Sequence, residues 1–138
     1  MKKLLLLFAL CVFALTACES KMDKIANKLQ NSPTMRVPGF GEINSCYVEG
    51  EDIVFETDAS ARFLSYDVIK SDDNNKYMIG DNAVTTIFHY GIGDDVLNPG
   101  SNIGIIFRFK WADGKCVDVR FASSEIQAQA QSLADKFN

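Results

Sequence analysis

The sequence predicts an α+β fold: an antiparallel sheet of two β-hairpins with helices before, between and after them. Two stretches in which apolar and polar residues alternate around a glycine-containing turn predict the hairpins. Apolar residues that recur every three or four positions outside these stretches predict the helices. We expect a single domain over residues 39–138, a length sufficient for one hydrophobic core.

Residues 18–38 precede this domain, and their pattern favours a short helix. Four apolar residues recur there at helical spacing, namely Met22, Ile25, Ala26 and Leu29. The helix should end before Pro33, because proline cannot continue it. The alternative is a tether, although a plain linker has no need of an amphipathic pattern.

The first hairpin is predicted from two short runs rich in β-branched and aromatic residues, 42–48 and 53–57, on either side of Glu49-Gly50-Glu51-Asp52. Its carboxylates Glu49, Glu51 and Asp52 form a candidate acidic binding surface for a basic protein partner. The alternative is that these charges keep exposed strand edges from pairing with other chains.

The second hairpin is predicted from residues 102–111 and 116–122, joined by Ala112-Asp113-Gly114-Lys115. Five apolar residues of the first run share one face: Ile103, Ile105, Phe107, Phe109 and Trp111. Arg108 and Lys110 take the opposite face, and in the second run Asp118 and Arg120 alternate with apolar residues.

Two further helices are expected. Residues 84–90 fit a helix through the stripe that includes Ala83 and Ile87, but their β-branched content also fits a strand; we prefer the helix. At the C-terminus, apolar residues at helical spacing run from Ile126 to Phe137. Ser124 and Gln127 fit a capping box at the start of that helix.

The first 17 residues have the organisation of a secretory signal peptide. Lys2 and Lys3 precede twelve apolar residues, which end at the small pair Thr16 and Ala17. Twelve residues of helix span about 18 Å, well short of the roughly 30 Å hydrocarbon core of a bilayer. We therefore expect cleavage after Ala17 and not a membrane-spanning anchor.

The stretch Leu15-Thr16-Ala17-Cys18 resembles the lipobox of bacterial lipoproteins. The resemblance implies that Cys18 receives a diacylglycerol and that its new amino group is acylated with a fatty acid such as palmitate, so that several chains hold the domain to a membrane. Glu19 follows, where lipoproteins kept in the inner membrane of enteric-type bacteria typically have Asp. The resemblance therefore implies the outer membrane, facing the periplasm.

The rest of the chain resembles, loosely, small uncharacterised bacterial lipoprotein domains, through the hairpin pattern of residues 104–115. Without residues 1–17 the chain has 12 basic and 18 acidic residues, a formal charge of about −6. That balance lacks the basic footprint of a nucleic-acid-binding protein. Cys46 and Cys116 then remain unmodified, and an oxidising compartment favours a disulfide between them; two free thiols are the alternative.

Few residues suggest catalysis. His89 is the one histidine and has no partner that the sequence identifies, and motifs for a serine nucleophile or a phosphate-binding loop are missing. Residues 72–75 offer oxygen ligands, but the next positions break the order of a calcium loop. We expect no enzyme activity, no cofactor and no metal site.

These observations favour a non-catalytic envelope lipoprotein that binds another protein, with the membrane contacted through the lipid on Cys18. One alternative is a periplasmic immunity or inhibitor lipoprotein whose acidic surface complements a basic target. Another is an accessory, pilotin-like lipoprotein of an envelope assembly, in which the C-terminal helix docks on a partner.

Overall fold

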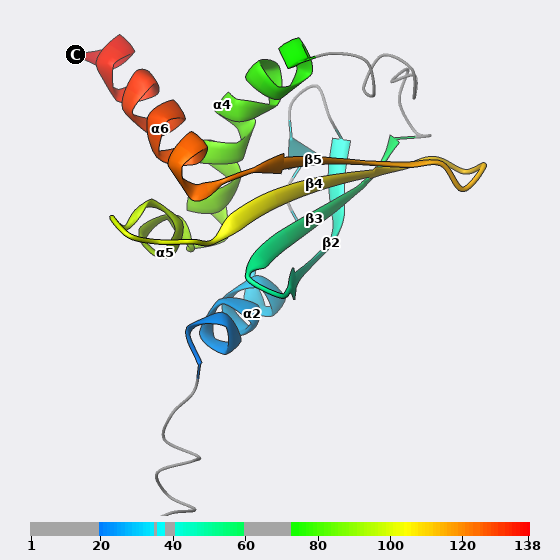
Figure 1. The fold of residues 1–138 in the computed structure, drawn as a ribbon. Coiled ribbons are helices and arrows are strands. Elements are labelled where there is room, and N and C mark those ends of the chain that lie inside the picture. Colours follow the sequence, from blue (N-terminus) through cyan, green and yellow to red (C-terminus); the bar gives the residue numbers. More distant parts are fainter. Residues whose placement is uncertain (1–19, 35, 38–40, 60–72) are drawn as a thin grey trace, which may run out of the picture.

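The computed structural model describes residues 20–34, 36–37, 41–59 and 73–138 (Figure 1). Ala17 and Cys18, and with them the predicted cleavage and lipidation positions, lie outside these ranges. Within the described part of the chain, no helix is long and apolar enough to cross a membrane.

The sheet has five strands in the order β1-β2-β3-β4-β5. Their bounds are β1 Arg36–Val37, β2 Gly41–Glu49, β3 Asp52–Asp58, β4 Gly104–Lys110 and β5 Cys116–Phe121. Neighbours are antiparallel except β3 and β4, which run parallel, with Phe55 beside Phe107. The α+β class is confirmed, but the sheet is mixed, so the prediction of an antiparallel sheet is wrong.

The parallel pair follows from what joins the two hairpins. After β3 the chain continues to helices α4 (Asp73–His89) and α5 (Gly93–Leu97) before it re-enters the sheet as β4. Parallel neighbours require such a long crossover connection, whereas antiparallel neighbours need only a tight turn. Helix α4 includes nearly all of residues 84–90, so the preferred helix is confirmed there.

Both hairpins lie where the sequence predicts them. The first turns at two residues between the paired Glu49 and Asp52, with Gly50 at a φ of 65°. The second turns at 111–115, with Gly114 at a φ of 88°. Glycine adopts positive φ without the steric cost that a Cβ imposes, which explains these positions in tight turns.

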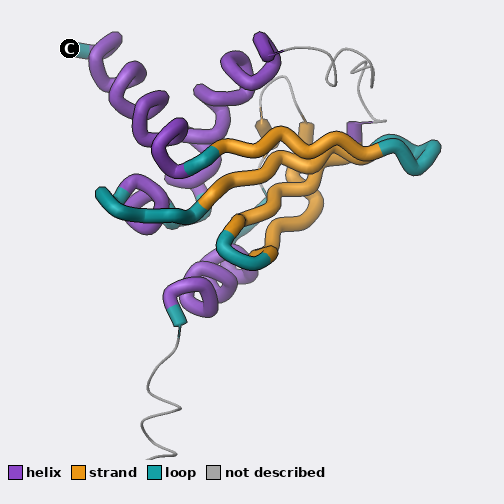
Figure 2. The backbone as a smooth tube through the Cα atoms, viewed as in Figure 1, coloured by secondary structure: helices purple, strands orange, loops and turns teal. Residues whose placement is uncertain are grey.

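The described helices all contribute to one core on one face of the sheet. Helix α4 passes behind the strands in Figures 1 and 2, and α2 (Lys21–Asn31) lies against β2. The rings of Phe55, Phe107 and Phe121 form the aromatic centre of this core, with adjacent ring centroids 5.7 and 6.2 Å apart. The other face of the sheet carries no described helix.

Helix α2 belongs to the domain. Ser20 caps it: the Ser20 hydroxyl accepts from the Asp23 backbone N–H, and the Asp23 carboxylate accepts from the Ser20 backbone N–H. Ile25 and Leu29 are buried in the same core as the sheet. The helix predicted within residues 18–38 thus agrees with the structure, and it packs in the same core as the sheet although it precedes residue 39.

Helix α6 (Ser123–Phe137) begins earlier than the predicted capping box allows. The Ala122 backbone N–H donates to the Glu125 carboxylate, while the Gln127 amide donates to the carbonyl of Asn98. The capping box on Ser124 and Gln127 is therefore wrong, because both residues lie inside the helix. Ile126 is fully buried, so the first half of α6 is packed into the core.

Candidate functional site

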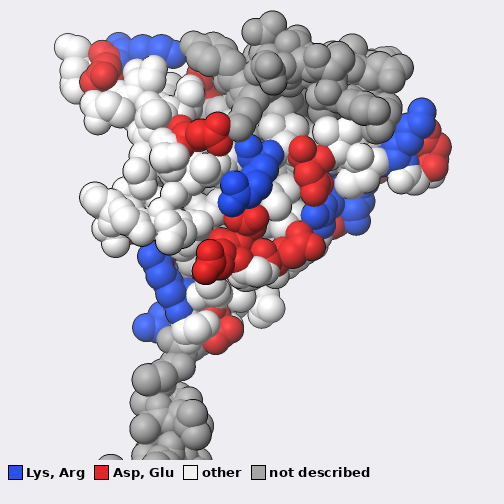
Figure 3. All heavy atoms as spheres, viewed as in Figure 1, with Lys and Arg blue, Asp and Glu red and all other residues white. Residues whose placement is uncertain are grey.

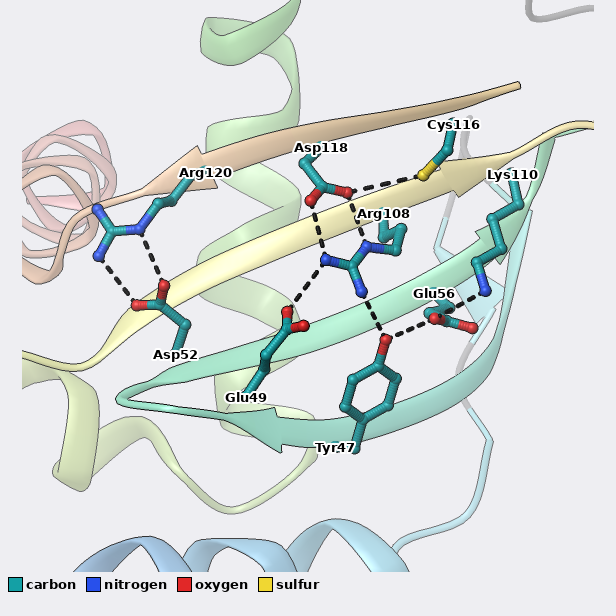
Figure 4. Close-up of polar contacts among 9 residues, drawn as sticks. All are labelled: Tyr47, Glu49, Asp52, Glu56, Arg108, Lys110, Cys116, Asp118 and Arg120. Carbon is teal, nitrogen blue, oxygen red and sulfur yellow. Dashed lines mark hydrogen bonds and ion pairs between the residues drawn. The ribbon is translucent and has the colours of Figure 1, made fainter. Parts of the chain in front are cut away.

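The face of the sheet opposite the helices carries a lattice of paired charges, which we call the open face. Side chains alternate along each strand, so the residues between the core positions all project to this side. Figure 3 shows basic and acidic side chains interleaved over it, and Figure 4 shows their contacts. Its labelled members are Tyr47, Glu49, Asp52, Glu56, Arg108, Lys110, Cys116, Asp118 and Arg120.

Arg108 on β4 is the centre of this lattice. Its Nε and Nη2 donate to the two carboxylate oxygens of Asp118, at 2.8 and 2.9 Å. Nη2 also reaches Glu49 at 3.0 Å, and Nη1 donates to the hydroxyl oxygen of Tyr47 at 2.7 Å. The hydrogen bond to Asp118, and after it the one to Glu49, raise the pKa of the Arg108 guanidinium.

A second group of contacts continues from Tyr47. The Tyr47 hydroxyl donates to Glu56 Oε1 at 2.6 Å, and Lys110 Nζ lies 3.0 Å from the same oxygen. Burial opposes ionisation of Glu56, but the hydrogen bonds from Tyr47 and Lys110 outweigh it, and the pKa of Glu56 is lowered. The same bond to Glu56 raises the pKa of the Tyr47 hydroxyl.

A third pair lies at the other end of the open face. Arg120 on β5 donates two hydrogen bonds to the Asp52 carboxylate on β3, at 3.1 and 2.9 Å. The pair passes over Gly104 of the intervening β4, where a Cβ would collide with Asp52 Oδ1 and lie 2.6 Å from Arg120 Nη2. The missing side chain at Gly104 is what makes room for this pair.

Two apolar side chains lie beneath the charges. Val54 and Ile106 are neighbours on β3 and β4, and they alternate with core residues, so they project to the open face. They are nevertheless only 0% and 8% exposed. The long side chains of the lattice lie on the same face, and the apolar stems of arginine commonly cover such residues.

Cys46 and Cys116, the two cysteines among the described residues, are free in the structure, so the disulfide predicted between them is absent there. Cys46 on β2 faces the core, where its thiol donates to the Leu29 carbonyl at 3.7 Å, whereas Cys116 on β5 lies on the open face beside Asp118. Strands β2 and β5 are three strand spacings apart, about 14 Å. A disulfide needs Cα atoms within about 7 Å, so opposite faces and distant strands exclude it.

The candidate acidic surface is found at the end of the first hairpin, but it is largely neutralised. Glu49 pairs with Arg108 and Asp52 with Arg120, while Glu51 is exposed in the turn. Sequence reasoning missed these arginines as partners. The alternating pattern of the second hairpin shows that both arginines lie on its polar face. The sequence does not show that this hairpin lies beside the first one, where Glu49 and Asp52 are.

The lattice is poorly suited to proton transfer near neutral pH. A general acid or base works best when its pKa lies close to the working pH, and here the pKa of Glu56 and that of Arg108 have both moved away from neutrality. His89 lies elsewhere, on α4, with Nε2 3.2 Å from the Pro33 carbonyl oxygen. Among the described residues no cluster of His, Cys, Asp or Glu could hold a metal ion.

An open pocket of about 310 Å³ lies beside the lattice, at the end of β3 and β4. Glu56 and Lys110, which pair with each other, line it together with Asn44, Thr57, Asp58, Trp111 and Ala112. Its lining thus combines charged and polar residues with one aromatic residue, Trp111. No family model, curated protein or solved structure matches this chain.

Proposed function

We propose that this chain is a non-catalytic lipoprotein of the bacterial cell envelope, held to the outer membrane by lipid on Cys18, and that its domain binds another protein in the periplasm. The observation that carries this proposal is the position of Ser20, which caps α2 only two residues after Cys18. A capped and packed helix thus lies directly after the residue that the lipobox resemblance predicts as the lipid attachment point, and this short spacing supports the proposal.

The short link has a mechanical consequence. Two residues of extended chain span about 7 Å, so a lipid on Cys18 would hold α2 close to the membrane surface. Because Ile25 and Leu29 of α2 pack in the core, a lipid that holds α2 at the membrane would hold the whole domain there. An anchored domain of this kind stays close to the membrane surface, where it can bind a partner in the periplasm.

The chemistry of the open face also favours binding. Its ionised groups satisfy one another through hydrogen bonds, and the pKa values of Glu56 and Arg108 keep both groups charged near neutral pH. The exposed Glu51 at the hairpin end and the net charge of about −6 outside residues 1–17 favour a basic partner over an acidic one.

The packing of α6 bears on the accessory, pilotin-like alternative. A helix that docks on a partner should keep its apolar stripe available, yet Ile126 is 0% exposed and Ala130 and Leu133 are half-buried against the core. Of the apolar stripe of α6, only the last turn, which includes Phe137, is exposed to solvent. This favours a self-contained binding domain over a detachable docking helix.

Anchoring is tested first, by labelling with a radioactive or clickable palmitate in a bacterial host. The wild-type chain should incorporate the label, and Cys18→Ala should not. Cys116→Ala is the matched control, because it removes a cysteine that faces the open side of the sheet and should leave labelling unchanged. Equal labelling of Cys18→Ala would contradict the anchor.

Binding is tested by crosslinking in the native membrane, followed by capture of the wild-type chain and, as the unanchored control, of Cys18→Ala. One dominant, anchor-dependent partner is expected. A basic lytic enzyme or toxin would identify the inhibitor version of the proposal, and a component of an envelope machine the accessory version. If folded, anchored protein enriches no partner, the binding role is refuted.

A further inference from the structure

Strand β5 forms an outer edge of the described sheet. It pairs with β4 on one side, and in the described residues no strand follows it on the other. Such an edge carries backbone N–H and C=O groups that can pair with an additional strand. The second outer strand, β1, has only two residues, so β5 is the longer edge.

The helical layer reaches further than the sheet at this edge. In Figure 1 the C-terminal part of α6 lies beyond β5, and Phe137 near its end is 87% exposed. Val117 and Val119, which face the core side of β5, are only half-buried. Among the described residues, the core side therefore continues past the point where the sheet stops.

The sequence of β5 is complementary to itself when two copies run antiparallel. Residues directly opposite in a sheet point to the same face, so Asp118 and Arg120 of the open face must lie opposite open-face residues. With Val119 opposite Val119 of a second copy, Asp118 lies opposite Arg120 in both directions. On the core side, Val117 then lies opposite Phe121.

The neighbouring registers are less favourable. If the two-fold axis lies at residue 118, Asp118 is opposite Asp118 of the second copy; if it lies at residue 120, Arg120 is opposite Arg120. Like charges directly opposite destabilise a strand pair. Shifts that change the face place charged residues opposite apolar ones. The register centred on Val119 is therefore the one that matches charge, face and length together.

We propose that two copies of this chain associate through β5, as an antiparallel strand pair with a two-fold axis at Val119, into one continuous sheet of both copies. Isologous contacts of this kind are the commonest form of homodimer. A two-fold axis places Ser20 of both copies at the same height along it, so both lipids can enter one membrane that lies across the axis.

The test uses cysteine crosslinking of the full-length chain in its native membrane. In a Cys116→Ser background, Val119→Cys should give a disulfide-linked dimer under mild oxidation, since directly opposite Cα atoms lie about 4.5–5.5 Å apart, within disulfide range. The readout is a band at twice the monomer mass on a non-reducing gel, which a reductant abolishes.

Val117→Cys in the same background is the matched control. It lies on the same strand and face and is also half-buried, but in the proposed register the two copies of residue 117 are about 14 Å apart along the strands. It should therefore give no dimer above background. Protease resistance equal to that of the parent chain verifies that both variants fold.

Three outcomes would overturn the proposal. Equal amounts of disulfide-linked dimer from the two variants would show that the crosslinks come from random collision. No dimer from folded Val119→Cys would show that β5 does not pair with β5 of a second copy. A crosslink from residue 119 to a different protein would assign the edge to another partner. Charge reversal is a poorer test, because Asp118 and Arg120 also bind Arg108 and Asp52 within one copy.

Discussion

Arg108 on β4 lies directly opposite Asp118 on β5, and its guanidinium donates hydrogen bonds of 2.8 and 2.9 Å to the two oxygens of that carboxylate. Two parallel bonds between a planar guanidinium and a carboxylate form a more specific and stronger contact than a single ion pair. The same guanidinium also contacts Glu49 and Tyr47, so one side chain joins β2, β4 and β5 across the open face.

Arg108→Lys should lower the free energy of unfolding by about 1 kcal/mol, because an ammonium keeps the charge but cannot reproduce the fork of donors. Arg108→Ala should cost more, about 2 kcal/mol, since it also uncovers Val54 and Ile106. The checks are urea unfolding curves of the three proteins. Equal stability of the lysine variant and the parent would show that the paired geometry contributes nothing.

Gly104→Ala tests the space beneath the Asp52–Arg120 pair. The new Cβ would displace both side chains, and because the pair is partly exposed the expected cost is small, about 0.5 kcal/mol. In an Asp52→Ala, Arg120→Ala background the same change should be neutral or stabilising, because alanine is less flexible than glycine. The measurement is the unfolding midpoint of all four proteins; an unchanged sign in both backgrounds would contradict the steric explanation.

Local features of this fold were predictable from the sequence. Alternation of apolar and polar residues is visible within a few positions, which is why both hairpins and the core face of β4 were predicted. The turn at Asp113 and Gly114 also fixes the register of its hairpin, so the Arg108–Asp118 pair could have been derived as a cross-strand contact.

Features that depend on the order of the strands were not predictable. The contacts from Arg108 to Tyr47 and Glu49, and from Arg120 to Asp52, join the two hairpins, and these come together only because β3 and β4 are neighbours in the sheet. The disulfide was also predicted without knowledge of the strand order. A spacing of cysteines along the chain does not show that Cys46 and Cys116 lie on opposite faces of one sheet.

Glu56 makes the stability of the domain sensitive to acid. Its pKa in the folded state is lowered below the ordinary value of 4.5, so its contribution is fully present above that value and is lost as the pH falls through the folded pKa. Tyr47→Phe removes one hydrogen bond to the carboxylate and should raise the pKa of Glu56. Carbon-detected NMR titration of the Glu56 carboxyl group measures this directly.

The control for this titration is Lys110→Met, which removes the second donor to Glu56 and should also raise its pKa. If Tyr47→Phe left the titration midpoint of Glu56 unchanged while Lys110→Met moved it, the tyrosine would be a neighbour without electrostatic influence.

The reactivity of the cysteines should show which of them is buried in the folded protein, and their number should show whether residues 1–17 are removed and Cys18 carries lipid. In the folded protein an alkylating reagent should modify Cys116 before Cys46, because only Cys116 is exposed. Burial and then the nearby Asp118 raise the pKa of the Cys116 thiol, so the reaction should be slow at neutral pH and faster in Asp118→Asn.

Mass spectrometry of the denatured protein then gives the total number of thiols. Two reactive thiols are expected if residues 1–17 are removed and Cys18 carries lipid. A reductant should change neither this number nor the melting temperature, because neither cysteine is oxidised. A reductant-dependent shift in either quantity would show that a disulfide forms in the envelope after all.

The last prediction concerns the place of α2 in the domain. Ile25 is 0% exposed and belongs to the same core as the sheet, so Ile25→Ala should lower the free energy of unfolding by about 2–4 kcal/mol. Lys24→Ala, on the exposed side of the same helix, should change it by less than about 0.5 kcal/mol. Urea unfolding of both variants compares them under identical conditions. Because Ser20, which caps α2, lies two residues after Cys18, a large effect at Ile25 means that a lipid on Cys18 is attached close to the folded core and not through a tether. Equally small effects of the two substitutions would show that α2 does not stabilise the domain, and would remove the structural support for close membrane attachment.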